Sequence, residues 1–83
     1  MKTAEDFRQI SFNVFVSKHI VLVARAERVI EKAADLGEFG TVFEVPEDRD
    51  TTDMLRKYLH WKGFTTSTPM FTLDKVNAIE ITW

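Results

Sequence analysis

The sequence lacks several features on which common classes of protein depend. None of its 83 residues is cysteine, which excludes disulfide bonds, thiolate catalysis and cysteine-ligated zinc. Positive charge is not in excess, since the net charge is −2 at pH 7, and this argues against general nucleic-acid binding or a membrane-surface role. The most apolar run, residues 20–24, is far too short to cross a bilayer, and the first residues lack the apolar region of a signal peptide. We therefore expect a soluble, cytoplasmic protein with one domain, residues 1–83.

Motifs that carry chemistry are also scarce. The sequence has no nucleophile elbow, phosphate-binding loop or dinucleotide-binding glycine pattern. His19 lies on an apolar helical stripe with no second ligand three or four residues away, so we interpret it as a core or interface histidine rather than a metal ligand. We predict no catalytic residue, no metal, no cofactor and no enzymatic activity. A minimal hydrolase acting through His60 is the least favoured alternative.

The most prominent pattern present is one long amphipathic helix over residues 4–36. Thr3 can cap its start, Asp6 supplies negative charge in its first turn, and Gly37 is the expected stop. Apolar side chains recur at intervals of three and four, which predicts a stripe facing the core. The stripe consists of Phe12, Phe15, Val16, His19, Leu22, Val23, Ala26, Val29, Ile30, Ala33 and Leu36.

The first half of this helix carries a second apolar strip on a different side. We call it the outer strip, and it consists of Phe7, Ile10, Val14, Ile20 and Val21. An unbroken helix of this length would be about 50 Å long, whereas a compact domain of this size is about 30 Å across. The helix therefore either bends near residues 17–19 or is covered along its first half by another chain. The outer strip favours another chain and predicts a homo-oligomer interface at these residues.

The rest of the chain predicts three strands and a second helix. A strand at residues 41–45 ends at Pro46, and a helix follows from residue 51 or 52 to residue 62, capped by Asp50 or Thr51 and stopped by Gly63. A strand at residues 64–73, a turn at 74–77 and a strand at 78–83 complete the chain.

These elements predict an α+β fold. The second helix connects the first two strands, which should therefore be parallel, and the last two strands should form an antiparallel hairpin. We expect a two-layer α-β-α-β-β architecture. Its three-stranded mixed sheet, in the order 1-3-2, would be covered on one face by both helices, of which the first is long.

One polar cluster is a candidate ligand site, because a cationic helix end leads into a run of hydroxyl groups. Such a combination can bind a phosphate or a nucleotide-like anion. The dipole of a helix C-terminus repels anions, however, and cations are common there for structural reasons, so a structural role is favoured over ligand binding. The cluster consists of Arg56, Lys57, His60, Lys62, Thr65, Thr66, Ser67 and Thr68.

The order of these segments resembles a known family. The motifs are Lys-Thr-Ala-Glu at residues 2–5, Ala-Ala-Asp-Leu-Gly-Glu-Phe at 33–39, Val-Pro at 45–46, Leu-His-Trp-Lys-Gly-Phe at 59–64 and Ile-Glu-Ile-Thr-Trp at 79–83. Together they are similar to a family of short uncharacterised proteins of tailed bacteriophages and prophages. The resemblance covers most of the chain and rests on structural motifs, and no established active site comes with it.

The resemblance implies a non-catalytic phage accessory protein that acts by binding in the cytoplasm of the bacterial host. It would act either by sequestering a nucleotide signal of host defence or by blocking a host protein. The alternative is a virion or assembly component, in which the same apolar helix docks on a larger phage protein.

Overall fold

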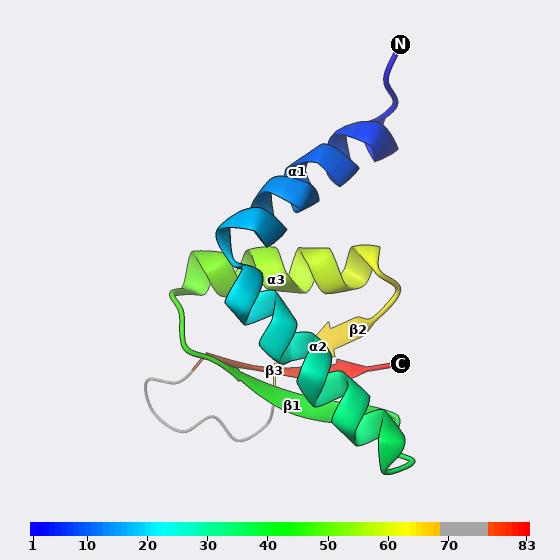
Figure 1. Ribbon diagram of the computed structural model, residues 1–83, viewed down its shortest axis with the longest axis vertical. Coiled ribbons are helices and arrows are strands. Elements are labelled where there is room, and N and C mark those ends of the chain that lie inside the picture. Colours follow the sequence, from blue (N-terminus) through cyan, green and yellow to red (C-terminus); the bar gives the residue numbers. More distant parts are fainter. Residues whose placement is uncertain (69–76) are drawn as a thin grey trace.

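The computed structural model describes residues 1–68 and 77–83 of the chain (Figure 1). Its helices are α1 (Ala4–Lys18), α2 (Ile20–Asp35) and α3 (Arg49–Trp61), and its strands are β1 (Gly40–Val45), β2 (Thr65–Ser67) and β3 (Asn77–Thr82). Half of the predicted strand at residues 64–73 and most of the turn at 74–77 lie outside the described residues. Within the described part, no helix is both long enough and apolar enough to cross a membrane.

The prediction of one long helix is wrong, because the chain leaves the helical conformation at His19. Its φ of −127° and ψ of 41° separate α1 from α2. A straight helix of about 50 Å would exceed the longest dimension of the molecule, 44 Å. The bend instead wraps the predicted core stripe around a single core, in which Phe12 and Phe15 of α1 join Leu22 of α2.

The sheet has the predicted strand order, β1-β3-β2. β3 pairs antiparallel with β1, from Gly40↔Thr82 to Val45↔Asn77, and antiparallel with β2, from Thr65↔Thr82 to Ser67↔Glu80. The two outer strands run in the same direction, as expected, but they do not pair with each other. The sheet is therefore antiparallel rather than mixed.

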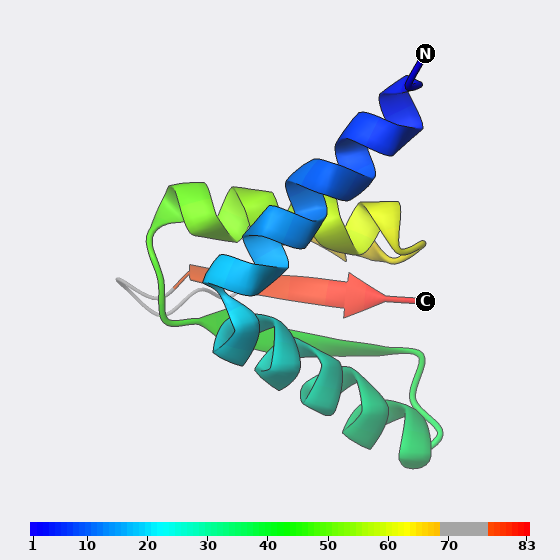
Figure 2. The ribbon, with the colours of Figure 1, turned by 45° about the horizontal axis from the view of Figure 1, so that its top comes forward.

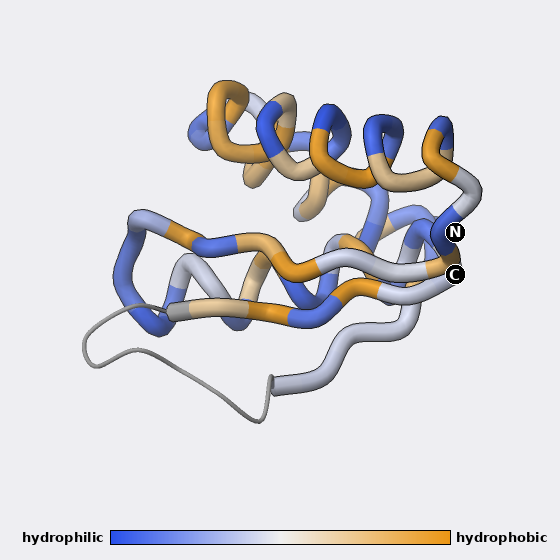
Figure 3. The backbone as a smooth tube through the Cα atoms, turned by 90° about the horizontal axis from the view of Figure 1, so that it is seen from below, coloured by the Kyte–Doolittle hydropathy of each residue, from blue (hydrophilic) through white to orange (hydrophobic). Residues whose placement is uncertain are grey.

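The helices cover one face of the sheet, which confirms the two-layer α+β architecture. α2 packs on β1, and α3 packs on β2 and β3, while α1 crosses α3 and its N-terminal end extends beyond the rest of the molecule (Figures 1 and 2). Hydropathy alternates along β3 (Figure 3), where the buried Ile79 and Ile81 face the helices. In β1 the buried Phe43 shares this face, whereas Val42 is 51% exposed on the other.

Local signals at the helix ends explain where most of the helices begin and stop. The Thr3 hydroxyl accepts a hydrogen bond from the Asp6 amide at 3.3 Å, and the Asp6 carboxylate accepts one from the Thr3 amide at 2.8 Å. Gly37 and Gly63 have φ angles of +81° and +97°, as their predicted stop positions require.

The predicted start of the second helix is wrong by two to three residues. α3 begins at Arg49, and its cap is Asp48 rather than Asp50 or Thr51. The Asp48 carboxylate accepts a hydrogen bond from the Thr51 amide at 2.8 Å. Hydrogen bonds from the Thr51 side chain and amide lower the pKa of this carboxyl, and the charge of His19 acts in the same direction. Aspartate is a favoured cap residue, and residues 47–50 include two of them. The sequence alone therefore does not show which one caps the helix.

Candidate functional site

A groove of about 860 Å³ lies between α1, α3 and β2 and is the candidate site. α3 contributes Asp53, Arg56, Lys57 and His60, whose spacing of three and four places them on one face of the helix. The full lining consists of Arg8, Phe12, Asp53, Arg56, Lys57, His60, Trp61 and Thr66. Part of the predicted ligand cluster therefore does meet in space, together with residues from α1.

Strand geometry divides the predicted run of hydroxyl groups between the two faces of the sheet. Thr66 pairs with the fully buried Ile81 and so shares the face covered by the helices, whereas Thr65 and Ser67 lie on the opposite face. The Thr66 hydroxyl is 2.8 Å from Nε2 of His60, and Nη2 of Arg56 donates to the Thr68 hydroxyl at 3.1 Å. Thr65 and Ser67 are therefore not part of the groove.

Lys62 also lies apart from the groove, contrary to the prediction. Its Nζ is 5.0 Å from the centroid of the Trp61 ring and 5.9 Å from that of Tyr58. Two residues beyond His60, a helical side chain points roughly 200° away, so Lys62 lines a separate hollow that includes Glu27 and Glu31. Tyr58 lies beside Lys62. Burial of the Tyr58 hydroxyl, and then the charge of Glu27, raise the pKa of this group.

An aromatic wall closes the groove on the side of α1. Phe12 stacks on Trp61 with ring centroids 5.0 Å apart and planes 26° apart, and it meets Tyr58 edge-on at 5.8 Å. Such pairs each add about 0.5–1.5 kcal/mol beyond the burial of their surface. The sequence pattern assigned Phe12 to the core alone. No local pattern in the sequence indicates that α1 contacts the end of α3.

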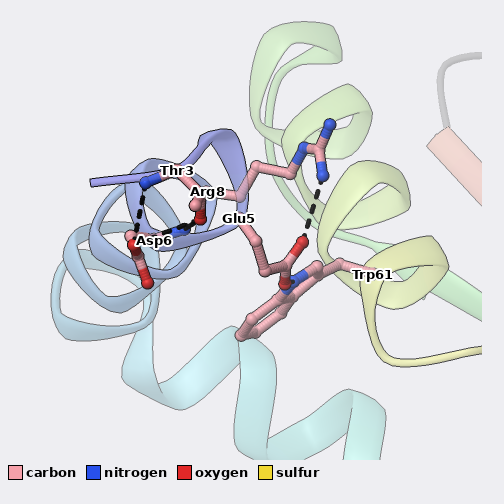
Figure 4. A network of polar contacts seen from close by, with 5 residues as sticks. All are labelled: Thr3, Glu5, Asp6, Arg8 and Trp61. Carbon is pink, nitrogen blue, oxygen red and sulfur yellow. Dashed lines mark hydrogen bonds and ion pairs between the residues drawn. The ribbon is translucent and has the colours of Figure 1, made fainter. Parts of the chain in front are cut away.

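Polar contacts hold the first turn of α1 against the last turn of α3 (Figure 4). Nε1 of Trp61 donates to one carboxylate oxygen of Glu5 at 2.6 Å, and Nη1 of Arg8 donates to the other at 3.0 Å. These contacts, Trp61 first, lower the pKa of the Glu5 carboxyl. Glu5 and Arg8 thus position the rim of the groove, and neither was predicted as a site residue.

In the described part of the chain, Arg56 and Lys57 line the groove without a partner of opposite charge. Arg8 forms an ion pair with Glu5, but none among residues 1–68 and 77–83 involves Arg56, Lys57 or His60. The Nε of Arg56 is buried and has no hydrogen-bond acceptor in that same part of the chain. Asp53 also lines the groove, but Arg8, Arg56 and Lys57 leave the lining with an excess of positive charge, which favours an anion.

The outer strip is the second candidate surface. Phe7 is 57% exposed, Ile10 45% and Val14 49%, and Phe7 also lines a hollow with Met54 and Lys57 of α3. Ile20 and Val21 continue the strip beyond the bend, with 64% and 63% of their surfaces exposed. The bend at His19 thus relieves the excess length of the predicted helix but leaves this strip uncovered by the chain itself.

His19 is half-buried, with its ring 5.0 Å from that of Phe15. No group of three or more histidine, aspartate or glutamate side chains in the described residues is placed to bind a metal ion.

Comparisons with protein-family models, with curated proteins and with solved structures find no match to this chain. The resemblance to proteins of tailed phages stays a prediction.

Proposed function

We propose that this protein is a small non-catalytic phage accessory protein that assembles with copies of itself and acts by binding. The observation that carries the assembly is the exposure of the outer strip. Contiguous exposed apolar side chains mark an interaction surface, and between 45% and 64% of the surface of each residue in the outer strip is exposed. The phage context and the nature of the target, a host nucleotide signal or a host protein, come from the sequence resemblance alone.

A second copy of the chain is the occupant that best fits the outer strip. Phe7, Ile10 and Val14 recur at intervals of three and four, which is the spacing of a seam between two packed helices. No charged side chain interrupts this spacing, so an identical apolar strip is a complementary surface. Burial of each large apolar side chain contributes up to about 1.5–3 kcal/mol, which favours association in so small a domain.

Light scattering coupled to size-exclusion chromatography tests the assembly. The wild type should have the mass of a dimer or a larger oligomer, and Phe7→Glu plus Val14→Glu should have that of a monomer, because two charges would have to be buried. The matched control is Gln9→Glu plus Asn13→Glu, which adds the same charge at exposed positions of the same helix and should leave the mass unchanged. A monomeric wild type, or an unchanged mass in the strip variant, would contradict the proposal.

The virion or assembly component is the alternative that uses the same strip. It predicts a chain that aggregates alone and becomes soluble when a larger phage protein is added. A stable, closed homo-oligomer in the chromatography experiment would exclude it.

The hydrolase alternative rests on His60 and Thr66, which are 2.8 Å apart and so as close as a base and its nucleophile. A histidine base is normally oriented by a third group that bonds its other ring nitrogen. Within the described residues, the only hydrogen bond of the His60 ring is the one to Thr66. Binding is therefore the better-supported role for this groove.

A further inference from the structure

We propose that the groove between α1, α3 and β2 binds an organic phosphate monoester, such as a nucleoside monophosphate. The phosphate would lie against Arg56, Lys57 and His60, and the organic part would lie along Phe12 and the edge of Trp61. The inference rests on the proposed function, since it names a ligand class for a protein that acts by binding.

Arg56 points to an oxyanion because the described residues leave most of its hydrogen-bonding capacity unused. A guanidinium has five N–H donors, and the only acceptor of Arg56 among the described residues is the Thr68 hydroxyl, bonded to Nη2. Its Nε is buried without an acceptor there. The buried Nε is out of reach of a ligand, so a phosphate would meet the terminal nitrogens, Nη1 and Nη2, and phosphate oxygens are well matched to these donors of a guanidinium.

The neighbouring side chains favour phosphate over a singly charged carboxylate. Lys57 lies one residue from Arg56 and His60 lies one turn further along the same face, so three nitrogen groups converge on one region of the groove. The Thr66 hydroxyl adds a further donor or acceptor. A phosphate monoester carries nearly two negative charges and three terminal oxygens, which can accept from several of these groups at once.

The size of the groove argues for an organic ester rather than inorganic phosphate. Ligand pockets of about 300–1,000 Å³ bind molecules the size of a drug or nucleotide, and this groove measures about 860 Å³. Phe12 and Trp61 provide an apolar wall. Phe12 covers one face of the Trp61 ring, and the Lys62 ammonium lies over the ring at 5.0 Å, so a ligand meets the ring edge instead of stacking. Affinity should therefore depend more on the phosphate than on the identity of the base.

The structure weakens the objection raised by the dipole of the helix C-terminus for Arg56 and Lys57, although His60 lies in the last turn. The last carbonyl groups of α3 are occupied, since Gly63 donates to the His60 carbonyl at 3.0 Å and Phe64 donates to that of Leu59 at 2.9 Å. Arg56 and Lys57 lie more than one turn before Lys62, the C-cap residue. The effect of the dipole fades within the last turn, so it opposes an anion at these cations only weakly.

Isothermal titration calorimetry with adenosine monophosphate, uridine monophosphate, adenosine and inorganic phosphate tests the inference. Both monophosphates should bind the wild-type protein with similar affinity. Adenosine and inorganic phosphate should each bind at least about tenfold more weakly, because each lacks one half of the ligand. Failure of both monophosphates to bind, or equal affinity for adenosine monophosphate and adenosine, would overturn the inference.

The variant Arg56→Gln plus Lys57→Gln should bind adenosine monophosphate at least about tenfold more weakly than the wild type. Its matched control, Arg28→Gln plus Lys32→Gln, removes the same charge from the exposed side of α2 and should bind as the wild type does. Lys57→Gln alone serves as a second test in case the double variant misfolds. Lys57 is exposed, so its replacement should leave the fold intact and still weaken the binding of adenosine monophosphate. Equal weakening in the control variant would show a general charge effect and would refute the site.

The same titration of Phe7→Glu plus Val14→Glu separates the two proposals. Binding that persists in a monomeric strip variant shows that the groove works without assembly. An oligomeric wild type that binds neither monophosphate would leave the assembly intact and overturn the ligand class. Binding by a wild type that is monomeric would support the ligand and contradict the assembly.

Discussion

At the scale of single residues, Trp61 joins parts of the chain that are far apart in sequence. Its ring stacks on Phe12, and its Nε1 donates to Glu5, 56 residues away. The same ring forms one wall of the groove. A single indole thus fixes the angle of α1 and shapes the candidate site.

Replacement of Trp61 by phenylalanine should raise the pKa of the Glu5 carboxyl. The indole donor is the main cause of the lowered pKa, and Arg8 alone cannot replace it. A lowered pKa in the folded state stabilises the fold above the unfolded pKa, and this contribution is lost as the pH falls through the folded pKa. Trp61→Phe should therefore lose less stability than the wild type between neutral pH and about pH 3.

Carbon-detected NMR titration of Glu5 measures this effect, and urea unfolding at both pH values measures its consequence. Trp83→Phe is the matched control, since that indole has no hydrogen bond to Glu5, and its Glu5 titration should match the wild type. An unchanged Glu5 pKa in Trp61→Phe would show that the hydrogen bond in Figure 4 does not persist in solution.

At the scale of elements, α3 determines the site because it carries the cationic face and ends beside β2. Its end is defined by Gly63 in the left-handed conformation, with two backbone hydrogen bonds that close the last turn. The next residue, Phe64, turns the chain so that Thr66 comes opposite His60. The stop signal of the helix and the position of the site are therefore linked.

Gly63→Ala should lower the free energy of unfolding by about 1 kcal/mol. A Cβ at this position would meet no atom within 4 Å, so the cost arises from the positive φ of +97° and not from a clash. Urea denaturation measures it. Gly63→Asn should cost less, because asparagine tolerates this conformation better than alanine. Equal stability of the alanine variant and the wild type would be inconsistent with the left-handed stop.

At the scale of the whole molecule, the described residues form one core and leave large apolar side chains exposed in more than one place. The core contains Leu55, Ile79 and Ile81, each with 0% of its surface exposed. The outer strip runs along α1 and the start of α2. Leu36 and Phe39, exposed by 71% and 76%, lie instead at the other end of α2. Only the outer strip has the spacing of a helix seam.

The thermal midpoint of the wild type should rise with protein concentration if the outer strip is an interface. Association stabilises the folded state by mass action. For a dimer of this size, a tenfold increase in protein concentration should raise the thermal midpoint by roughly 3 to 6 °C. Differential scanning calorimetry over a hundredfold range of concentration measures the shift. Phe7→Glu plus Val14→Glu should unfold at one midpoint throughout, whereas a flat response in the wild type would argue for a monomer.

Local patterns in the sequence were sufficient for most of the elements. Thr3, Gly37 and Gly63 act through hydrogen bonds and backbone angles within a few residues, so their roles are visible without the fold. Alternation in β1 and β3 reports which side chains are buried, because successive side chains of a strand point to opposite faces. Chain connectivity then predicts the strand order, since a helix between two strands and a final hairpin leave few arrangements.

Tertiary structure decided the bend at His19 and the composition of the site. No glycine or proline marks the bend, which follows from packing Phe12 and Leu22 against one core. The hydroxyl run was visible in the sequence, but its division between two faces depends on which residues of β2 pair with β3. Arg8 and Trp61 meet at the groove only because α1 crosses α3, and contacts between residues so far apart leave no periodic trace in the chain.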